Sequence, residues 1–146
     1  MTTVAEILKS KREALVHTIK PDDSVFDALQ RMADKGVGAL LVMEGETIVG
    51  IVTERDYARK IALKGRTSAL TMVRDVMTTA VMFVKPSHTS DECMALMTEN
   101  RLRHLPVVQN DKLIGLVSIG DLVKDIISEQ KFVIEQLEHY ITGQRG

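Results

Sequence analysis

This chain contains the same pattern twice. Residues 19–61 and 84–126 align without a gap at an offset of 65 residues. The residues paired by this offset include Pro21 and Pro86, Met32 and Met97, Gly50 and Gly115, and Asp56 and Asp121. A tandem duplication therefore dominates the fold, and two short copies bury more apolar surface by packing together than either buries alone. We expect a pair of related clefts where the copies meet, and these clefts are where a ligand site is sought.

Each copy reads as strand, helix, strand, strand, helix. The first strands, 15–20 and 81–85, stop at prolines, and Ser or Thr then starts a capping box that opens an amphipathic helix. Two hairpin strands follow, and Thr53 and Ser118 end the hairpins and start the last helices. The fold class is therefore α/β (α+β), with two βαββα repeats packed in pseudo-two-fold symmetry and a three-stranded sheet flanked by helices in each.

The pattern also predicts domain boundaries. We assign residues 1–66 to the first repeat with an N-terminal lead-in helix, 67–128 to the second repeat, and 129–146 to a C-terminal helical extension. Residues 73–77 echo residues 4–8, so each repeat has a short helical lead-in. The extension has no counterpart in the first copy and covers the core or a partner subunit. Its apolar residues at helical spacing are Phe132, Ile134, Leu137 and Ile141.

Composition excludes several classes of protein. The 146 residues carry 19 basic and 20 acidic side chains, a formal net charge of −1, so no overall field attracts nucleic acid or an anionic membrane. No apolar run reaches the roughly 18 residues of a membrane span, and residues 1–11 do not have the apolar stretch typical of a signal peptide, so we expect a cytoplasmic protein. The single Cys93 has no disulfide partner and is expected in the core. The histidines are scattered, and we expect no metal site.

Two hairpins carry a family resemblance. Residues 48–56 read Ile-Val-Gly-Ile-Val-Thr-Glu-Arg-Asp, residues 113–121 read Leu-Ile-Gly-Leu-Val-Ser-Ile-Gly-Asp, and Arg-His-Leu-Pro-Val occupies 103–107. Over residues 1–128 the chain resembles a tandem pair of cystathionine-beta-synthase (CBS) domains, often called a Bateman module. The resemblance implies a stand-alone regulatory unit that binds adenosine nucleotides, pairs into a homodimer through its helices, and acts on an unidentified enzyme or transporter.

Four residues at the ends of the hairpins suit a nucleotide chemically. Asp56 and Asp121 are ionised acceptors near helix starts, and the two oxygens of each can accept bonds from both hydroxyls of a ribose. Thr53 and Ser118 stand at helix N-termini, where hydroxyls, free N–H groups and the helix dipole favour a phosphate. Further phosphate donors nearby are Arg55, Arg103 and His104.

The adenine pocket is placed by the resemblance alone. It falls between the first strand and the start of the second. In the first cleft its residues would be Thr18, Ile19, Gly38 and Ala39, and in the second Phe83, Val84, His104 and Leu105. Gly38 lets backbone approach a ligand whereas its counterpart Arg103 does not, so we expect the two clefts to differ.

The same residues admit a simpler interpretation. Thr53-x-x-Asp56 and Ser118-x-x-Asp121 are also ordinary capping boxes, and Arg55, opposite Gly120 in the alignment, is also a solvated side chain. We therefore keep two functions open: a sensor that binds AMP, or alternatively ADP, ATP or NAD, and an interaction scaffold with empty clefts. An enzyme is disfavoured because no Cys/His pair, Ser/His/Asp set, metal cluster or Walker-type loop accompanies the aspartates.

Overall fold

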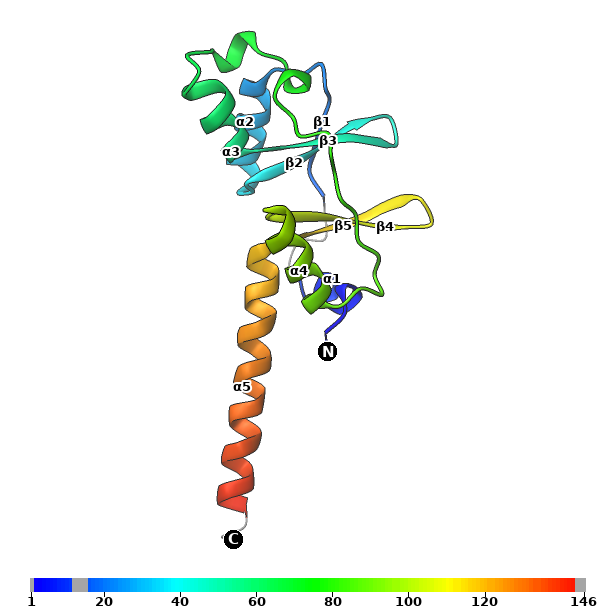
Figure 1. Ribbon diagram of the computed structural model, residues 1–146, viewed down its shortest axis with the longest axis vertical. Helices are drawn as coiled ribbons and strands as arrows, with labels where there is room; N and C mark the ends of the chain where they lie inside the picture. The colour runs from blue at the N-terminus through cyan, green and yellow to red at the C-terminus, as the bar shows by residue number, and fades with distance from the viewer. Residues whose placement is uncertain (1, 12–15, 144–146) are drawn as a thin grey trace. The chain divides into compact units, whose positions relative to one another are not determined.

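The computed structural model describes residues 2–11 and 16–143 (Figure 1). The N-terminal helix and the elements of the first copy are α1 (Val4–Ser10), β1 (Thr18–Ile19), α2 (Val25–Lys35), β2 (Ala39–Glu44), β3 (Thr47–Thr53), α3 (Glu54–Asp56) and the π-helical turn η1 (Tyr57–Ala62). Two 3-10 turns follow, η2 (Ser68–Leu70) and η3 (Val73–Asp75). The second copy contains α4 (Ser90–Asn100), β4 (His104–Gln109), β5 (Lys112–Ser118) and α5 (Ile119–Gly143). Helices flank small sheets, which confirms the predicted mixed α/β class.

The sheets reproduce the 65-residue offset in their register. In the first copy β1 runs parallel to β2, and β2 pairs antiparallel with β3 through Ala39 and Thr53. In the second copy β4 pairs antiparallel with β5 through His104 and Ser118. The first sheet has three strands as expected. In the second copy, the described residues form a two-stranded sheet of β4 and β5. A single parallel bridge between Val84 and Val107 lies where the third strand was expected, because only a short stretch of backbone pairs there.

The helix that follows the first strand in each copy starts and stops as its residues dictate. Ser24 caps α2 by accepting from the Asp27 N–H, and Thr89 and Glu92 close a reciprocal capping box on α4. Both helices end on a left-handed residue, Gly36 in α2 and Arg101 in α4. Glycine adopts this conformation at little cost, whereas arginine does so less readily. The two helices are therefore delimited by local side-chain chemistry.

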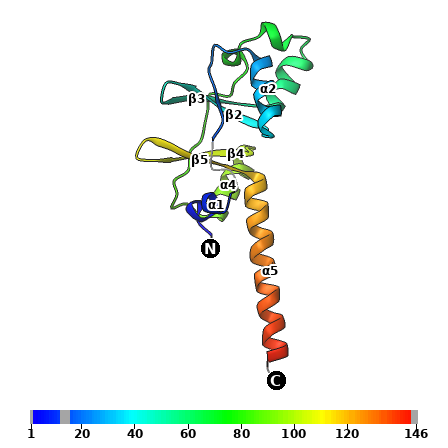
Figure 2. The same cartoon turned by 180° about the vertical axis from the view of Figure 1, so that it is seen from behind.

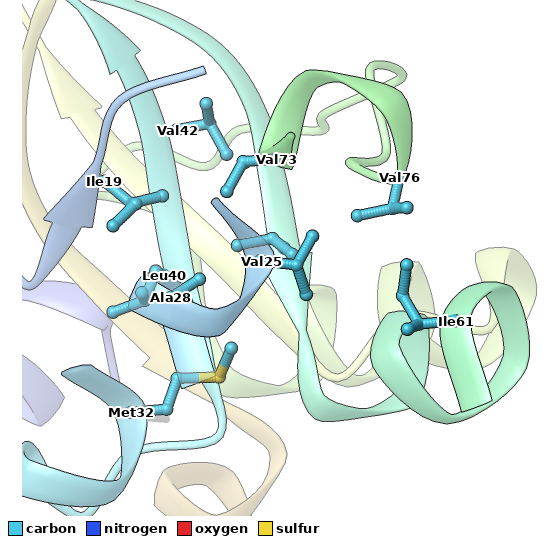
Figure 3. Close-up of a cluster of buried hydrophobic side chains, with 10 residues drawn as sticks. Ile19, Val25, Ala28, Met32, Leu40, Val42, Ile61, Val73 and Val76 are labelled. Carbon is cyan, nitrogen blue, oxygen red and sulfur yellow. The ribbon is translucent and has the colours of Figure 1, made fainter. Parts of the chain in front are cut away.

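The inner faces of the elements of the first copy form a compact apolar core (Figure 3). Its side chains point toward one another from β1, α2, the hairpin, η1 and η3, and include Ile19, Val25, Ala28, Met32, Leu40, Val42, Ile61, Val73 and Val76. In the second copy Cys93 takes the position of Ala28 and is fully buried. The expectation that this cysteine belongs to the core is confirmed.

The N-terminal lead-in packs on the second copy. Ser90 N–H donates to Thr2 O and Val4 N–H donates to His88 O, each at 2.8 Å. Two views show α1 beside α4 (Figures 1 and 2). The segment that precedes the first copy in sequence therefore completes the second copy in space.

The segment that precedes the second copy packs, in turn, on the first. Val25 N–H donates to Thr71 O and Val73 N–H donates to Asp23 O, again at 2.8 Å. These bonds match those of the N-terminal lead-in, residue for residue, at the offsets of 65 and 69 seen in the sequence. The two lead-ins have therefore exchanged places.

This exchange sets the compact units of the chain. One unit joins the described N-terminal residues to everything from Phe83 onward, and the other runs up to Met82. The sequence boundaries 1–66, 67–128 and 129–146 differ from these units, because they kept each lead-in with the repeat that follows it. The C-terminal segment continues α5 without a break.

Two glycines of the hairpins make room for the exchanged lead-ins. A Cβ on Gly50 would lie 2.8 Å from Met77 Sδ and 2.9 Å from the carbonyl oxygen of Thr78. A Cβ on Gly115 would lie 2.7 Å from Cδ2 of Leu8. At Gly50 the close atom is a backbone oxygen, so only a residue without a Cβ allows the approach, whereas at Gly115 the close atoms belong to a flexible side chain.

We predict that Gly50→Ala destabilises the protein by about 1–3 kcal/mol, because the added methyl group meets the fixed Thr78 carbonyl. Gly115→Ala should cost less, since the Leu8 methyl groups that it meets can rotate away. Gly38→Ala is the control, because its Cβ finds only the Glu54 Oε1 atom, at 3.5 Å. Urea unfolding of the three variants measures the order, and equal losses would contradict it.

Candidate functional site

The first copy holds its candidate ribose ligand at the end of β3. Asp56 Oδ2 accepts from the Thr53 N–H at 2.9 Å, and the Asp56 N–H donates to Thr53 Oγ1 at 3.2 Å. The other oxygen, Oδ1, lies 3.2 Å from Lys60 Nζ, which also donates to Val76 O at 2.7 Å. We call this arrangement the Asp56 site, and its carboxylate is only 13% exposed.

The second copy builds the same arrangement with a different lysine. Asp121 Oδ2 accepts from the Ser118 N–H at 2.9 Å, and the Asp121 N–H donates to Ser118 Oγ at 3.1 Å. The cation is Lys11, whose Nζ lies 2.9 Å from Asp121 Oδ2 and donates to Leu116 O at 2.7 Å. We call this arrangement the Asp121 site. Both sites therefore contain a capped helix start, a carboxylate and a lysine.

The strand register sets the start of the second strand against each cap. Ala39 lies opposite Thr53, and the Glu54 N–H donates to Gly38 O at 3.1 Å. At the other site His104 lies opposite Ser118, and Arg103 O accepts from the N–H of the first residue of α5 at 2.8 Å. The predicted phosphate and adenine residues on this strand are thus adjacent to the caps in both copies.

The first strand of each copy pairs beside the second. Ile19 lies opposite Val42, and Val84 lies opposite Val107. Arg31 of α2 donates to the carbonyl oxygen of Thr18. The predicted adenine residues therefore come from neighbouring strands in each unit, and one of their carbonyl groups already has a donor.

Burial divides the predicted residues into two groups. Four side chains that were assigned to the adenine pocket are at most 3% exposed, so they can offer a ligand little beyond their backbone groups: Ile19, Ala39, Val84 and Leu105. Thr18, Gly38 and His104 are half-buried, whereas Arg55, Arg103 and Phe83 are exposed. Side-chain contact with a ligand therefore falls to the second group and to the caps.

His104 combines burial with neighbouring charges. Burial lowers the pKa of its imidazole below the usual 6.5, Asp121 raises it, and Lys11 and Arg103 lower it further. The imidazole is thus neutral at pH 7 and can serve as a neutral hydrogen-bonding group beside the Asp121 carboxylate. A folded-state pKa below the unfolded value means that folding stability is lost as the pH falls through about 6.5.

We expect an NMR titration to place the His104 midpoint below pH 6.5. Lys11→Met should raise the pKa of His104, because it removes a nearby cation, and Asp121→Asn should lower it, because it removes the anion. Midpoints that stay fixed in both variants would show that the three side chains do not share one site.

Sequence reasoning missed the two lysines. Lys60 follows Asp56 by four residues, a helical spacing that pairs opposite charges and could have been recognised. Lys11 reaches Asp121 only because the lead-ins exchange places, and no local pattern announces that contact. The two copies therefore form equivalent lysine–aspartate ion pairs with lysines from different places in the sequence.

Across 2–11 and 16–143, no cluster of three or more His, Cys, Asp or Glu side chains is suitably placed for a metal ion. Within the same residues, no helix combines the length and apolar character needed to cross a membrane.

Comparison with known proteins identifies a protein family that matches most of this chain. The family model of the CBS domain matches residues 3–63 and again residues 73–128. The CBS domain-containing protein CBSX3, mitochondrial, of Arabidopsis thaliana is 40% identical over 150 residues, covering 97% of this chain and 73% of that protein.

Solved structures of similar proteins share the fold. A protein with CBS domains from Burkholderia ambifaria MC40-6 superposes with a TM-score of 0.86 at 57% identity, covering 88% of this chain and 96% of its own. CBSX2, solved in complex with AMP, superposes with a TM-score of 0.71 at 29% identity, covering 89% of this chain and 99% of its own.

Proposed function

Because this chain belongs to the CBS domain family, whose members are regulatory modules, we propose that it senses an adenosine nucleotide. The ligand would bind at the Asp56 site, the Asp121 site or both, and change how the chain binds a regulated enzyme or transporter. AMP is the ligand that we expect, with ADP, ATP and NAD as alternatives. We also propose a cytoplasmic homodimer as the acting form.

One observation supports this proposal above the others: the same polar arrangement is built twice. A carboxylate, a capping hydroxyl and a helix N-terminus meet at the end of a hairpin in each copy, in matching hydrogen bonds. Capping alone does not require Asp, since Thr89 and Glu92 form the same box on α4. The similarity to CBSX2, which was solved with AMP, indicates which ligand class to test first.

The residues suggest how a nucleotide would be held. The carboxylates would accept the vicinal ribose hydroxyls, and such charge-assisted bonds are stronger than neutral ones. Thr53 and Ser118, at their helix starts, would bind phosphate, together with the exposed Arg103 in the second copy. The half-buried His104 would add a neutral partner there.

The two sites would not be equivalent. Arg103 occupies the position of Gly38, so only the Asp121 site has a guanidinium group at the start of its second strand. The Asp56 site has Arg55 instead, exposed in the first turn after its cap. A nucleotide that carries more phosphate groups should therefore bind the two sites with different affinities.

Thermal unfolding with AMP, ADP, ATP, NAD and GMP tests the proposal. A ligand present at 100 times its Kd adds about 2.7 kcal/mol to the free energy of unfolding. We expect stabilisation by an adenosine nucleotide and none by GMP. Asp56→Ala or Asp121→Ala should weaken binding about 10- to 100-fold at its own site, as expected for losing a bond of about 1.5–3 kcal/mol to a charged group.

Glu92→Ala is the matched control, because it removes the acid of a capping box that belongs to neither site. It should lower the stability of the free protein as the aspartate variants do, yet leave nucleotide affinity unchanged. Equal affinity in Asp56→Ala, Asp121→Ala and the wild type would refute the ribose role.

A scaffold without a ligand is the second candidate. Both carboxylates already serve a capping box and an ion pair, so neither needs a ligand to be satisfied. Absence of stabilisation by every nucleotide tested would favour this function over the first.

A further inference from the structure

Most of the side chains of α5 are exposed. Leu122 is fully buried near the start of the helix, but every side chain from Ile127 to Ile141 is exposed. Figure 1 shows this part of α5 as one continuous helix beyond α4 and α1. Its large apolar side chains are 47–66% exposed, and they are Ile127, Phe132, Val133, Ile134, Leu137, Tyr140 and Ile141. A contiguous apolar surface of this kind marks an interaction site.

The exposed apolar residues follow the spacing of a coiled coil. Steps of four and three residues connect five of them through one polar position, Gln130, in the order Val123, Ile127, Gln130, Ile134, Leu137 and Ile141. In a heptad these are the d and a positions, which form the seam between two helices. A second row flanks the seam at seven-residue spacing, and its members are Ile126, Val133 and Tyr140. The seam is therefore shaped for another helix.

We propose that this helix is the α5 of a second copy of the chain, packed antiparallel. When one copy is reversed about Phe132, every seam residue meets a seam residue of the other copy. The resulting layers are Val123 with Ile141, Ile127 with Leu137, and Gln130 with Ile134, each formed twice. The overlap spans most of α5 and covers the seam from Val123 to Ile141, whereas Phe132 lies on the opposite face of the helix.

The residues beside the seam favour the antiparallel direction. In an antiparallel pair each flanking row meets the same row of the partner, slightly offset from the seam layers. On one side Ile126 therefore lies against Tyr140 and Val133 against its own copy, which extends the apolar contact. On the other side Lys124 faces Glu138, twice, as an opposite-charge pair. Lys131 meets its own copy at the axis and is the one like-charge pair of these rows.

A parallel pair would use the same seam less well. Flanking residues would then meet five positions along the partner, so Ile126 would face Lys131 and Val133 would face Glu138. Each of these contacts sets an apolar side chain against a charged one, and Lys124 would lose its opposite charge. Charge and apolar complementarity therefore identify an antiparallel second copy.

Sedimentation velocity of the full chain tests the association. Ile134→Asp places a charge in the central layer and should halve the wild-type mass at micromolar concentration. Ser128→Asp introduces the same group off the seam and should leave the mass unchanged. Circular dichroism checks that both variants keep their folded units. If the Ile134→Asp variant keeps the wild-type mass, or if the wild type is itself a monomer, the proposal is wrong and α5 has a different partner.

Disulfide cross-linking tests the direction. Lys131→Cys lies beside its own copy only in the antiparallel pair, so mild oxidation should give a covalent dimer. Leu137→Cys lies beside its own copy only in a parallel pair and should remain monomeric on denaturing gels. The native Cys93 is buried and does not interfere. Cross-linking of Leu137→Cys without Lys131→Cys overturns the antiparallel arrangement.

Discussion

The backbone hydrogen bonds of the exchanged lead-ins are the contacts on which the rest of the structure depends. Each copy lacks one layer of its own core until a segment from elsewhere in the chain supplies Val4 or Val73, both fully buried. Because the segments bond to the first helix of each copy and pack on its hairpin glycine, neither copy is complete by itself. Each compact unit is thereby built from two separate stretches of the chain or from one copy with the lead-in that follows it.

The same exchange reaches the candidate sites. Lys11 extends from the end of the N-terminal lead-in to Asp121, whereas Lys60 ties Asp56 to Val76 of the other lead-in. Each carboxylate is thus connected to the segment that closes its copy. A ligand that draws on the carboxylate would act on an element that holds the unit together, which suits a regulatory module.

Much of this could be anticipated from the residues, because it is local. The main helices and hairpins of both copies could be predicted from proline stops, Ser/Thr-x-x-acid caps and the hairpin pattern. Cys93 was correctly placed in the core. The extent of the second sheet and the π-helical turn after Asp56 were missed. Both depend on tertiary contacts of the backbone, which the periodicity of apolar residues in the sequence does not reveal.

The sequence by itself determined the duplication, its register and the chemistry available at each cap, since these follow from residue order and spacing. The tertiary structure alone decided which lead-in completes which copy, and therefore which lysine faces which aspartate. It also decided that four expected adenine residues bury their side chains. The physical reason is that the two lead-ins share a similar apolar pattern, and this local pattern does not say which hairpin each of them packs on.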